Sequence, residues 1–139
     1  ADIIKKMTQA QENISACANS AAQAAAVYAL KHPDFAETIR DEFVRRRKII
    51  LAALDAIPEI SYCVPQGAFY VFPDISTYGM TSYEFCSRLL EEERVVCIPG
   101  SAFGVCGEGH IRMAYTCSED ELTEAMRRFS RFCESVRRG

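Results

Sequence analysis

No apolar run in this sequence of 139 residues approaches the roughly 20 residues that a helix needs to cross a bilayer. No signal peptide is recognisable. The net charge of −3 gives no reason to expect nucleic acid or an anionic membrane as a partner. With 49% hydrophobic and 25% charged residues, the composition is that of an ordinary globular protein, which we expect to be soluble and cytoplasmic.

The sequence also lacks any C-x-x-C pair, although seven cysteines are many for this length. Their number is odd, and the two histidines that could join them as metal ligands, His32 and His110, lie far apart in sequence. Zinc sites and disulfide scaffolds both fit this pattern poorly, so we expect no metal site and predict free thiols in a reducing compartment. The cysteines are Cys17, Cys63, Cys86, Cys97, Cys106, Cys117 and Cys133.

Helical spacing of apolar residues fills the first part of the chain and predicts helices over residues 2–10, about 20–31 and 34–56. The third would span roughly 33 Å, long enough to run between two domains. Its successor Pro58 ends the helical pattern. Two capping boxes, each a Ser or Thr followed three residues later by Glu, predict later helices that begin at Thr81-Ser82-Tyr83-Glu84 and at Ser118-Glu119-Asp120-Glu121.

Short runs with extended spacing lie between the helices and predict four strands, over residues 60–64, 68–72, 95–98 and 110–115. The run at 95–98 is apolar throughout, which predicts a strand covered on both faces. We therefore predict an α/β fold, a small sheet of about four strands covered by helices.

Two domains are expected to contribute to the chain. Residues 1–31 form a helical segment from the end of a larger domain, and its alanine-rich second helix implies close packing against another element. Residues 32–139 form a small domain with the long helix 34–56 followed by the order β-β-α-β-β-α. Because the helical pattern begins immediately at Ala1, we expect the chain to be a piece of a longer protein.

A lone arginine occupies the middle of the last predicted strand. The period of two places Ile111, Met113 and Tyr115 on one face and Arg112 on the other. A guanidinium at a strand centre needs an anion or water, because burying it unpaired is costly. Its planar fork suits bidentate binding of a carboxylate or phosphate. An arginine on a wet sheet face is the alternative that these residues leave open.

Three motifs near this strand together resemble the C-terminal, small-domain part of a fold-type I, pyridoxal-phosphate-dependent aminotransferase of class I/II, in the aspartate aminotransferase group. The resemblance extends over essentially the whole chain. The motifs are Gly67-Ala68-Phe69-Tyr70-Val71-Phe72-Pro73, Pro99-Gly100-Ser101-Ala102-Phe103-Gly104 and Gly107-Glu108-Gly109-His110-Ile111-Arg112.

The resemblance implies roles for particular residues. Arg112 occupies the position of the arginine that binds the substrate α-carboxylate in this family, and Phe69 that of an aromatic residue at the edge of the active site. Ser101 and Phe103 are candidates for lining the loop near the substrate. From the residues themselves, Gly67 and Gly100 are predicted to serve as tight backbone turns.

The resemblance also implies pyridoxal 5'-phosphate, held in the family as a Schiff base by a lysine. This chain contains only Lys5, Lys6, Lys31 and Lys48, none in the family's context, and the family order puts the reactive lysine upstream of Ala1. We therefore expect no catalytic and no cofactor-binding residue here. The chain alone should neither hold the cofactor covalently nor turn over.

The complete enzyme is expected to act on an amino acid and a 2-oxo acid and to be a homodimer when full length, with this chain joined to the remainder of its own enzyme. Two alternatives stay open. One is a lyase or synthase of the same fold, of the C–S lyase or aminocyclopropane-carboxylate synthase type, which uses the same arginine for elimination. The other is a stand-alone, non-catalytic binding module.

Overall fold

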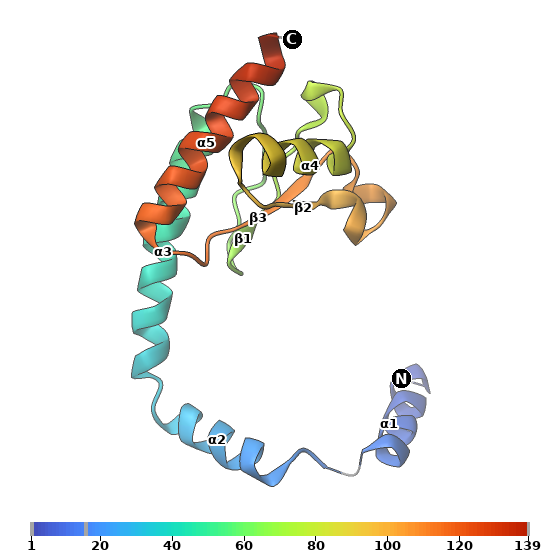
Figure 1. Cartoon of the computed structure of the whole chain (residues 1–139). Helices are drawn as coiled ribbons and strands as arrows, with labels where there is room; N and C mark the ends of the chain where they lie inside the picture. Colours follow the sequence, from blue (N-terminus) through green and yellow to red (C-terminus); the bar gives the residue numbers. More distant parts are fainter. Residues whose placement is uncertain (1, 16, 139) are drawn as a thin grey trace. The chain divides into compact units, whose positions relative to one another are not determined.

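The structure is a computed structural model that describes residues 2–15 and 17–138 (Figure 1). Its contacts divide the chain into two compact units, residues 1–39 and 40–139. Helices α1 (Asp2–Ile14) and α2 (Ser20–Lys31) belong to the first unit, and α3 (Asp34–Asp55) continues from the first into the second. Over the described ranges, none of the helices is both long and apolar enough to cross a membrane.

The first unit consists of helices whose described residues are not buried. Asn19 begins α2 by accepting hydrogen bonds from the backbone N–H groups of Ala21 and Ala22, at 2.9 and 3.3 Å. Neither α1 nor α2 contains a buried residue in the part that the structure describes. The close packing predicted for the alanine-rich α2 against another element stays a prediction.

The second unit contains a small antiparallel sheet with β3 in its centre. Its strands are β1 (Tyr70–Val71), β2 (Ile98–Pro99) and β3 (Ile111–Ala114), in the order β1-β3-β2. The register pairs Tyr70 with Ala114 on one side and Ile98 with Arg112 on the other. The arginine strand is thus held by backbone hydrogen bonds from both neighbours.

The described residues form three strands, one fewer than the four predicted. The segment 60–64 contributes only an isolated bridge between Ser61 and Asp74. Pairing stops there because Pro73 has no N–H to donate and the chain after Asp74 turns into the 3-10 helix η1 (Ser76–Tyr78). A helical turn cannot continue the ladder, so the neighbouring segment has no partner strand.

The prediction for residues 95–98 was also wrong in part. Only Ile98 of this run belongs to β2, and Val96 is 71% exposed between the buried Val95 and Cys97. The segment therefore alternates between an inner and an outer face instead of being covered on both.

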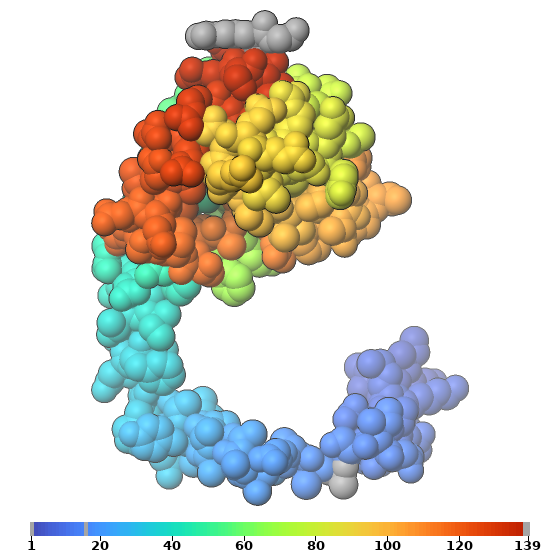
Figure 2. All heavy atoms as spheres, in the orientation of Figure 1, coloured from blue at the N-terminus to red at the C-terminus, as the bar shows by residue number. Residues whose placement is uncertain are grey.

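Helices α3, α4 (Ser82–Glu93) and α5 (Glu119–Arg138) supply the rest of the core of the second unit. Figure 2 shows the side chains of α4 closing against those of α5. Phe85 and Phe132 meet edge to face there, with ring centroids 5.0 Å apart. The most deeply buried side chains, which come from all three helices and the sheet, include Ile50, Leu54, Val71, Phe85, Leu89, Ile111, Tyr115, Phe129 and Phe132.

Candidate functional site

The two faces of β3 differ as the spacing predicts. Ile111, Met113 and Tyr115 are 0%, 5% and 1% exposed and belong to the core. Arg112 lies on the opposite face and is half-buried. Because a strand alternates its side chains, the burial of one set fixes the outward direction of the other. The prediction for this strand is confirmed.

Arg112 is flanked by two aromatic rings from separate elements. Its guanidinium carbon lies 5.5 Å from the ring centroid of Tyr70 in β1 and 5.0 Å from that of Phe103 in the 3-10 helix η2 (Gly100–Phe103). Both distances are typical of cation–π contacts. No hydrogen bond or ion pair joins the guanidinium to another side chain of the described residues. Its five donors are therefore available to an anion.

The aromatic contacts continue beyond the arginine. Phe103 meets Phe72 edge on at 6.0 Å, and Phe72 stacks on His110 at 5.2 Å with the planes 9° apart. The His110 Nδ1 atom lies 3.2 Å from the carbonyl oxygen of Glu108. His110 therefore helps to hold the loop and strand together rather than standing free beside Arg112.

Phe69 is 50% exposed and lies next to this group, with no ring contact to Arg112 among the described residues. Its ring meets Tyr70 edge on at 5.7 Å and Phe43 of α3 at 6.4 Å. Tyr115 fixes the backbone here, since its N–H donates to the Phe69 carbonyl at 2.9 Å and its hydroxyl donates to the Ala68 carbonyl at 3.2 Å. Phe69 is thus held at the rim of the aromatic group, one residue from the ring that covers the arginine.

The backbones of two glycines, Gly100 and Gly107, lie in direct contact and close the loop that carries Phe103. A Cβ atom on Gly100 would lie 1.9 Å from the Gly107 carbonyl oxygen, and one on Gly107 would lie 2.1 Å from that of Gly100. The Gly100 N–H also donates to the His110 carbonyl at 2.8 Å. The predicted backbone role is confirmed for Gly100. At Gly67 nothing lies within 4 Å of the position that a Cβ atom would take, so space alone does not demand glycine there.

Glu108 and Ser82 are the polar pair that sequence reasoning missed. The Ser82 backbone N–H donates to Glu108 Oε1 at 2.6 Å, and its hydroxyl donates to Oε2 at 3.0 Å. The N–H of Ser82, that of Gly109 and the Ser82 hydroxyl all lower the pKa of Glu108 by bonding its charged form. No local motif signals this link, because the partners are 26 residues apart. Tyr70, by contrast, could have been found from strand alternation.

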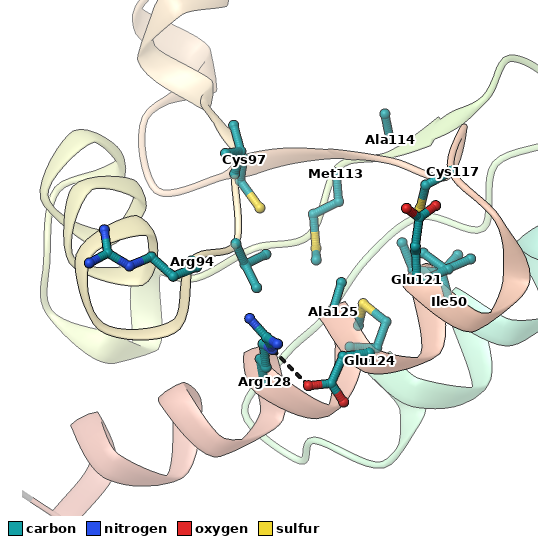
Figure 3. Close-up of a pocket in the computed structure, with 14 residues that line it drawn as sticks. Ile50, Arg94, Cys97, Met113, Ala114, Cys117, Glu121, Glu124, Ala125 and Arg128 are labelled. Atoms are coloured by element: carbon teal, nitrogen blue, oxygen red, sulfur yellow. Dashed lines mark hydrogen bonds and ion pairs between the residues drawn. The ribbon is translucent and has the colours of Figure 1, made fainter.

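A cavity of about 370 Å³ opens elsewhere in the second unit, between the sheet and α5 (Figure 3). Met113 and Cys97 line it, and Arg112 does not. Two arginines are among its lining residues, Arg94 and Arg128, and Arg128 is already paired with Glu124, at 2.7 Å. Free thiols, thioether and aliphatic groups make up much of the rest, so no converging set of polar groups points to a ligand.

Other reactive groups give no second site among the residues that the structure describes. All seven cysteines are free thiols, and burial raises the pKa of Cys86 and of Cys133 to about 11. No group of three or more His, Cys, Asp or Glu in residues 2–15 and 17–138 could hold a metal ion. The single lysine of the second unit, Lys48, is exposed on α3.

Comparison with known proteins gives consistent matches. The family described as aminotransferase class I and II matches residues 1–129. An aspartate aminotransferase of Pyrococcus horikoshii is 42% identical over 135 residues, which cover 95% of this chain and 34% of that protein. A probable N-acetyl-LL-diaminopimelate aminotransferase of Bacillus subtilis is 36% identical over 94% of this chain and 33% of its own.

Solved structures agree with these matches. The crystal structure of an aromatic aminotransferase from Pyrococcus horikoshii OT3 is 38% identical, with a TM-score of 0.85, over 97% of this chain and 36% of that one. An aspartate aminotransferase from Thermus thermophilus with maleate is 32% identical, with a TM-score of 0.79, over 94% of this chain and 34% of that one. The chain thus spans about a third of the length of the proteins it matches.

Proposed function

Since the chain belongs to the class I and II aminotransferase family, we propose that it is the part of such an enzyme that binds the α-carboxylate of the substrate. The complete enzyme would then transfer an amino group between an amino acid and a 2-oxo acid. The observation that carries the proposal is Arg112, half-buried between two aromatic rings with its donors available.

The surroundings of Arg112 suit a carboxylate. Tyr70 and Phe103 restrict the positions of the guanidinium and keep part of it away from water, which strengthens its attraction for an anion. Two parallel N–H donors would hold both carboxylate oxygens and so fix the carboxylate plane. A substrate held in this way presents its Cα–H bond in one orientation, a positioning effect that can lower a barrier by several kcal/mol.

Phe69 is proposed to border the bound substrate. Half of its ring is exposed, and it stands beside Tyr70 at the rim of the aromatic group. An exposed ring fixed by backbone hydrogen bonds offers an apolar surface to a substrate side chain. Ser101 and Phe103 belong to the same proposed site through η2.

Pyridoxal phosphate, the cofactor that the family implies, would supply the electron sink for breaking bonds at the substrate Cα. The residues around Arg112 do not fit a covalent site for it. Their side chains are aromatic rings, and no lysine amine is among the described contacts of this group. We propose that the residues that hold the cofactor lie in the rest of the enzyme, and that this chain contributes recognition of the substrate.

The enzyme is further proposed to be a cytoplasmic homodimer, with this chain joined to the remainder of its own enzyme. The matched proteins are about three times as long, which supports the proposal that this chain is joined to the remainder of a longer enzyme. The size of full-length enzyme measured by sedimentation tests the dimer, and a monomer that is fully active would contradict it.

The function is tested with full-length holoenzyme, amino donors and 2-oxoglutarate. L-aspartate, L-tyrosine and L-alanine are suitable donors, because the matched proteins are named for such amino acids. We expect amino transfer, and we expect Arg112→Gln to raise KM for donor and acceptor alike. Release of ammonia from the donor with no amino transfer to 2-oxoglutarate would indicate lyase chemistry instead.

The cofactor proposal has its own test on the isolated chain. The 139 residues are reduced with borohydride in the presence of pyridoxal phosphate and examined by mass spectrometry. We expect no site-specific adduct. A stable adduct on one of the four lysines would contradict the proposal.

A further inference from the structure

Glu108 joins two parts of the second unit that are distant in sequence. It lies in the loop before β3, yet its carboxylate accepts hydrogen bonds from the backbone N–H and the hydroxyl of Ser82, at the first turn of α4. A third bond comes from the N–H of the next residue, Gly109, at 3.1 Å. A negative charge at a helix N-terminus is also favourable. The carboxylate thus accepts three hydrogen bonds, from Ser82 and from Gly109.

Ser82 passes this attachment on to the loop that carries Phe103. Ser82 is 0% exposed, and a buried hydroxyl is costly unless it is bonded. Its Oγ lies 3.1 Å from the Ser101 hydroxyl and accepts from the Ser101 backbone N–H at 3.3 Å. Ser101 stands in η2, two residues before the ring that lies 5.0 Å from the guanidinium of Arg112.

The loop has little freedom to move by other routes. Contact between Gly100 and Gly107 closes it across its base, and the hydrogen bond from Gly100 to His110 ties that base to the start of β3. Phe103 lies beyond this closure, where its ring meets that of Phe72 and is still 53% exposed, so packing covers only part of it. The polar chain from Glu108 through Ser82 to Ser101 supplies the missing restraint.

We propose that Glu108 is a positioning residue of the substrate site, which acts through Ser82 and Ser101 to hold Phe103 over the guanidinium of Arg112. The inference rests on the proposed carboxylate-binding function of Arg112 and goes beyond it, because the hydrogen bonds of the Glu108 carboxylate to described residues go to Ser82 and Gly109 and not to the arginine. Removal of the Glu108 side chain leaves in place every group that is proposed to bind the substrate carboxylate. It frees only the Phe103 ring, which restricts the position of the Arg112 guanidinium.

This role predicts a specific kinetic signature. Glu108→Ala leaves Arg112 and both of its proposed donors in place, so the bound carboxylate keeps its orientation. A looser guanidinium then weakens binding of the ground state and of the transition state by a similar amount, which raises KM and leaves kcat nearly unchanged. The effect should also depend on Phe103, since Glu108 acts through that ring. Glutamine can accept the same backbone bonds through its amide oxygen, while its NH₂ group donates to the Ser82 hydroxyl oxygen. It should therefore restore the function.

The experiment compares Glu108→Ala, Glu108→Gln and Glu84→Ala in full-length holoenzyme, with L-aspartate as donor and 2-oxoglutarate as acceptor. Glu84 is the matched control, because it is an exposed acidic residue in the first turn of α4, the turn that contains Ser82. Its backbone N–H, and not its carboxylate, makes the hydrogen bond to the Thr81 side chain that caps the helix. We expect Glu108→Ala to raise KM for both substrates about fivefold, the loss of a cation–π contact, with kcat within about twofold. Glu108→Gln and Glu84→Ala should stay within about twofold of the parent enzyme.

The double variant Phe103→Ala/Glu108→Ala tests the route. We expect its KM to match that of Phe103→Ala alone, because the ring that Glu108 positions is already gone. Effects that multiply, or an unchanged KM in Glu108→Ala, would overturn the inference. If Glu108→Ala does not fold, Ser82→Ala gives the same test, because it removes the hydroxyl that joins Glu108 to Ser101. We expect it to raise KM about fivefold as well, and no rise would again overturn the inference.

One further variant separates this inference from the proposed function. Arg112→Lys should raise KM whether or not Glu108 has a role. An unchanged KM in Arg112→Lys would refute carboxylate binding by Arg112, and the inference with it. A raised KM in Arg112→Lys together with an unchanged KM in Glu108→Ala would refute the inference alone.

Discussion

The two faces of β3 use the same four-residue strand for different purposes. The inner face places Ile111 and Met113 in the core, where they are 0% and 5% exposed, and Tyr115 continues it. The outer face places Arg112 between two rings with its donors free among the described residues. The core fixes the strand, and the strand in turn fixes the direction of the guanidinium. Stability and recognition can therefore be changed separately.

Ile111→Ala, on the inner face of β3, should have the largest effect, and that effect should be on stability. Removing three buried carbons from a site that is 0% exposed leaves a cavity, so the free energy of unfolding should fall by about 2–5 kcal/mol. Urea unfolding of the 139-residue chain measures it. Ile111→Val is the graded control, with an expected loss of about 0.5–1.5 kcal/mol. Equal losses for both variants would show that the core does not depend on packing at this position.

Arg112→Lys, on the outer face, should lower activity and leave the stability of the chain almost unchanged. Lysine keeps the charge but replaces the planar fork with a single ammonium, so kcat/KM of the full-length enzyme should fall about 10- to 100-fold, the equivalent of one hydrogen bond to a charged group. The free energy of unfolding of the chain should change by less than about 0.5 kcal/mol. Arg127→Lys is the matched control, because Arg127 forms an exposed ion pair with Glu124 on α5. A large loss of stability in Arg112→Lys would mean that the two faces are not separable.

The smallest effects should appear as pH dependence, at opposite ends of the scale. Burial raises the pKa of Tyr115, so its contribution to stability is complete below the unfolded value of 10.0 and is lost as the pH rises through the folded value. The pKa of Glu108 is lowered from 4.5, so its contribution is present above that pH and is lost as the pH falls through the folded value.

Two variants measure these contributions. In unfolding free energies measured from acid to alkaline pH, Tyr115→Phe should make the alkaline limb less steep and leave the acid limb unchanged. Glu108→Gln should make the acid limb less steep and leave the alkaline limb unchanged. A variant that altered both limbs would indicate that the inner face and the loop of the outer face are coupled.

Local signals predicted most elements of the second unit because their causes lie within a few residues. The capping box at Ser118 forms as expected, since Ser118 Oγ accepts from the Glu121 N–H and Glu121 accepts from the Ser118 N–H, at 3.3 and 3.0 Å. At α4 only half of the box forms. Thr81 Oγ1 accepts from the Glu84 N–H at 3.2 Å, while Glu108 takes the N–H of Ser82. The same motif thus begins both helices, but at α4 the distant Glu108, and not the Glu of the motif, binds an N–H of the first turn, that of Ser82.

The sequence by itself determined the helices and the buried and exposed faces of β3, because side-chain periodicity and local capping are properties of neighbouring residues. The role predicted for Arg112 came from the resemblance of its motif to a family. Only the tertiary structure decided the number of strands, the two rings beside the guanidinium, the contact between Gly100 and Gly107 and the link from Glu108 to Ser82. These features join residues that are far apart in the chain, and a local sequence pattern does not show which distant residues come into contact.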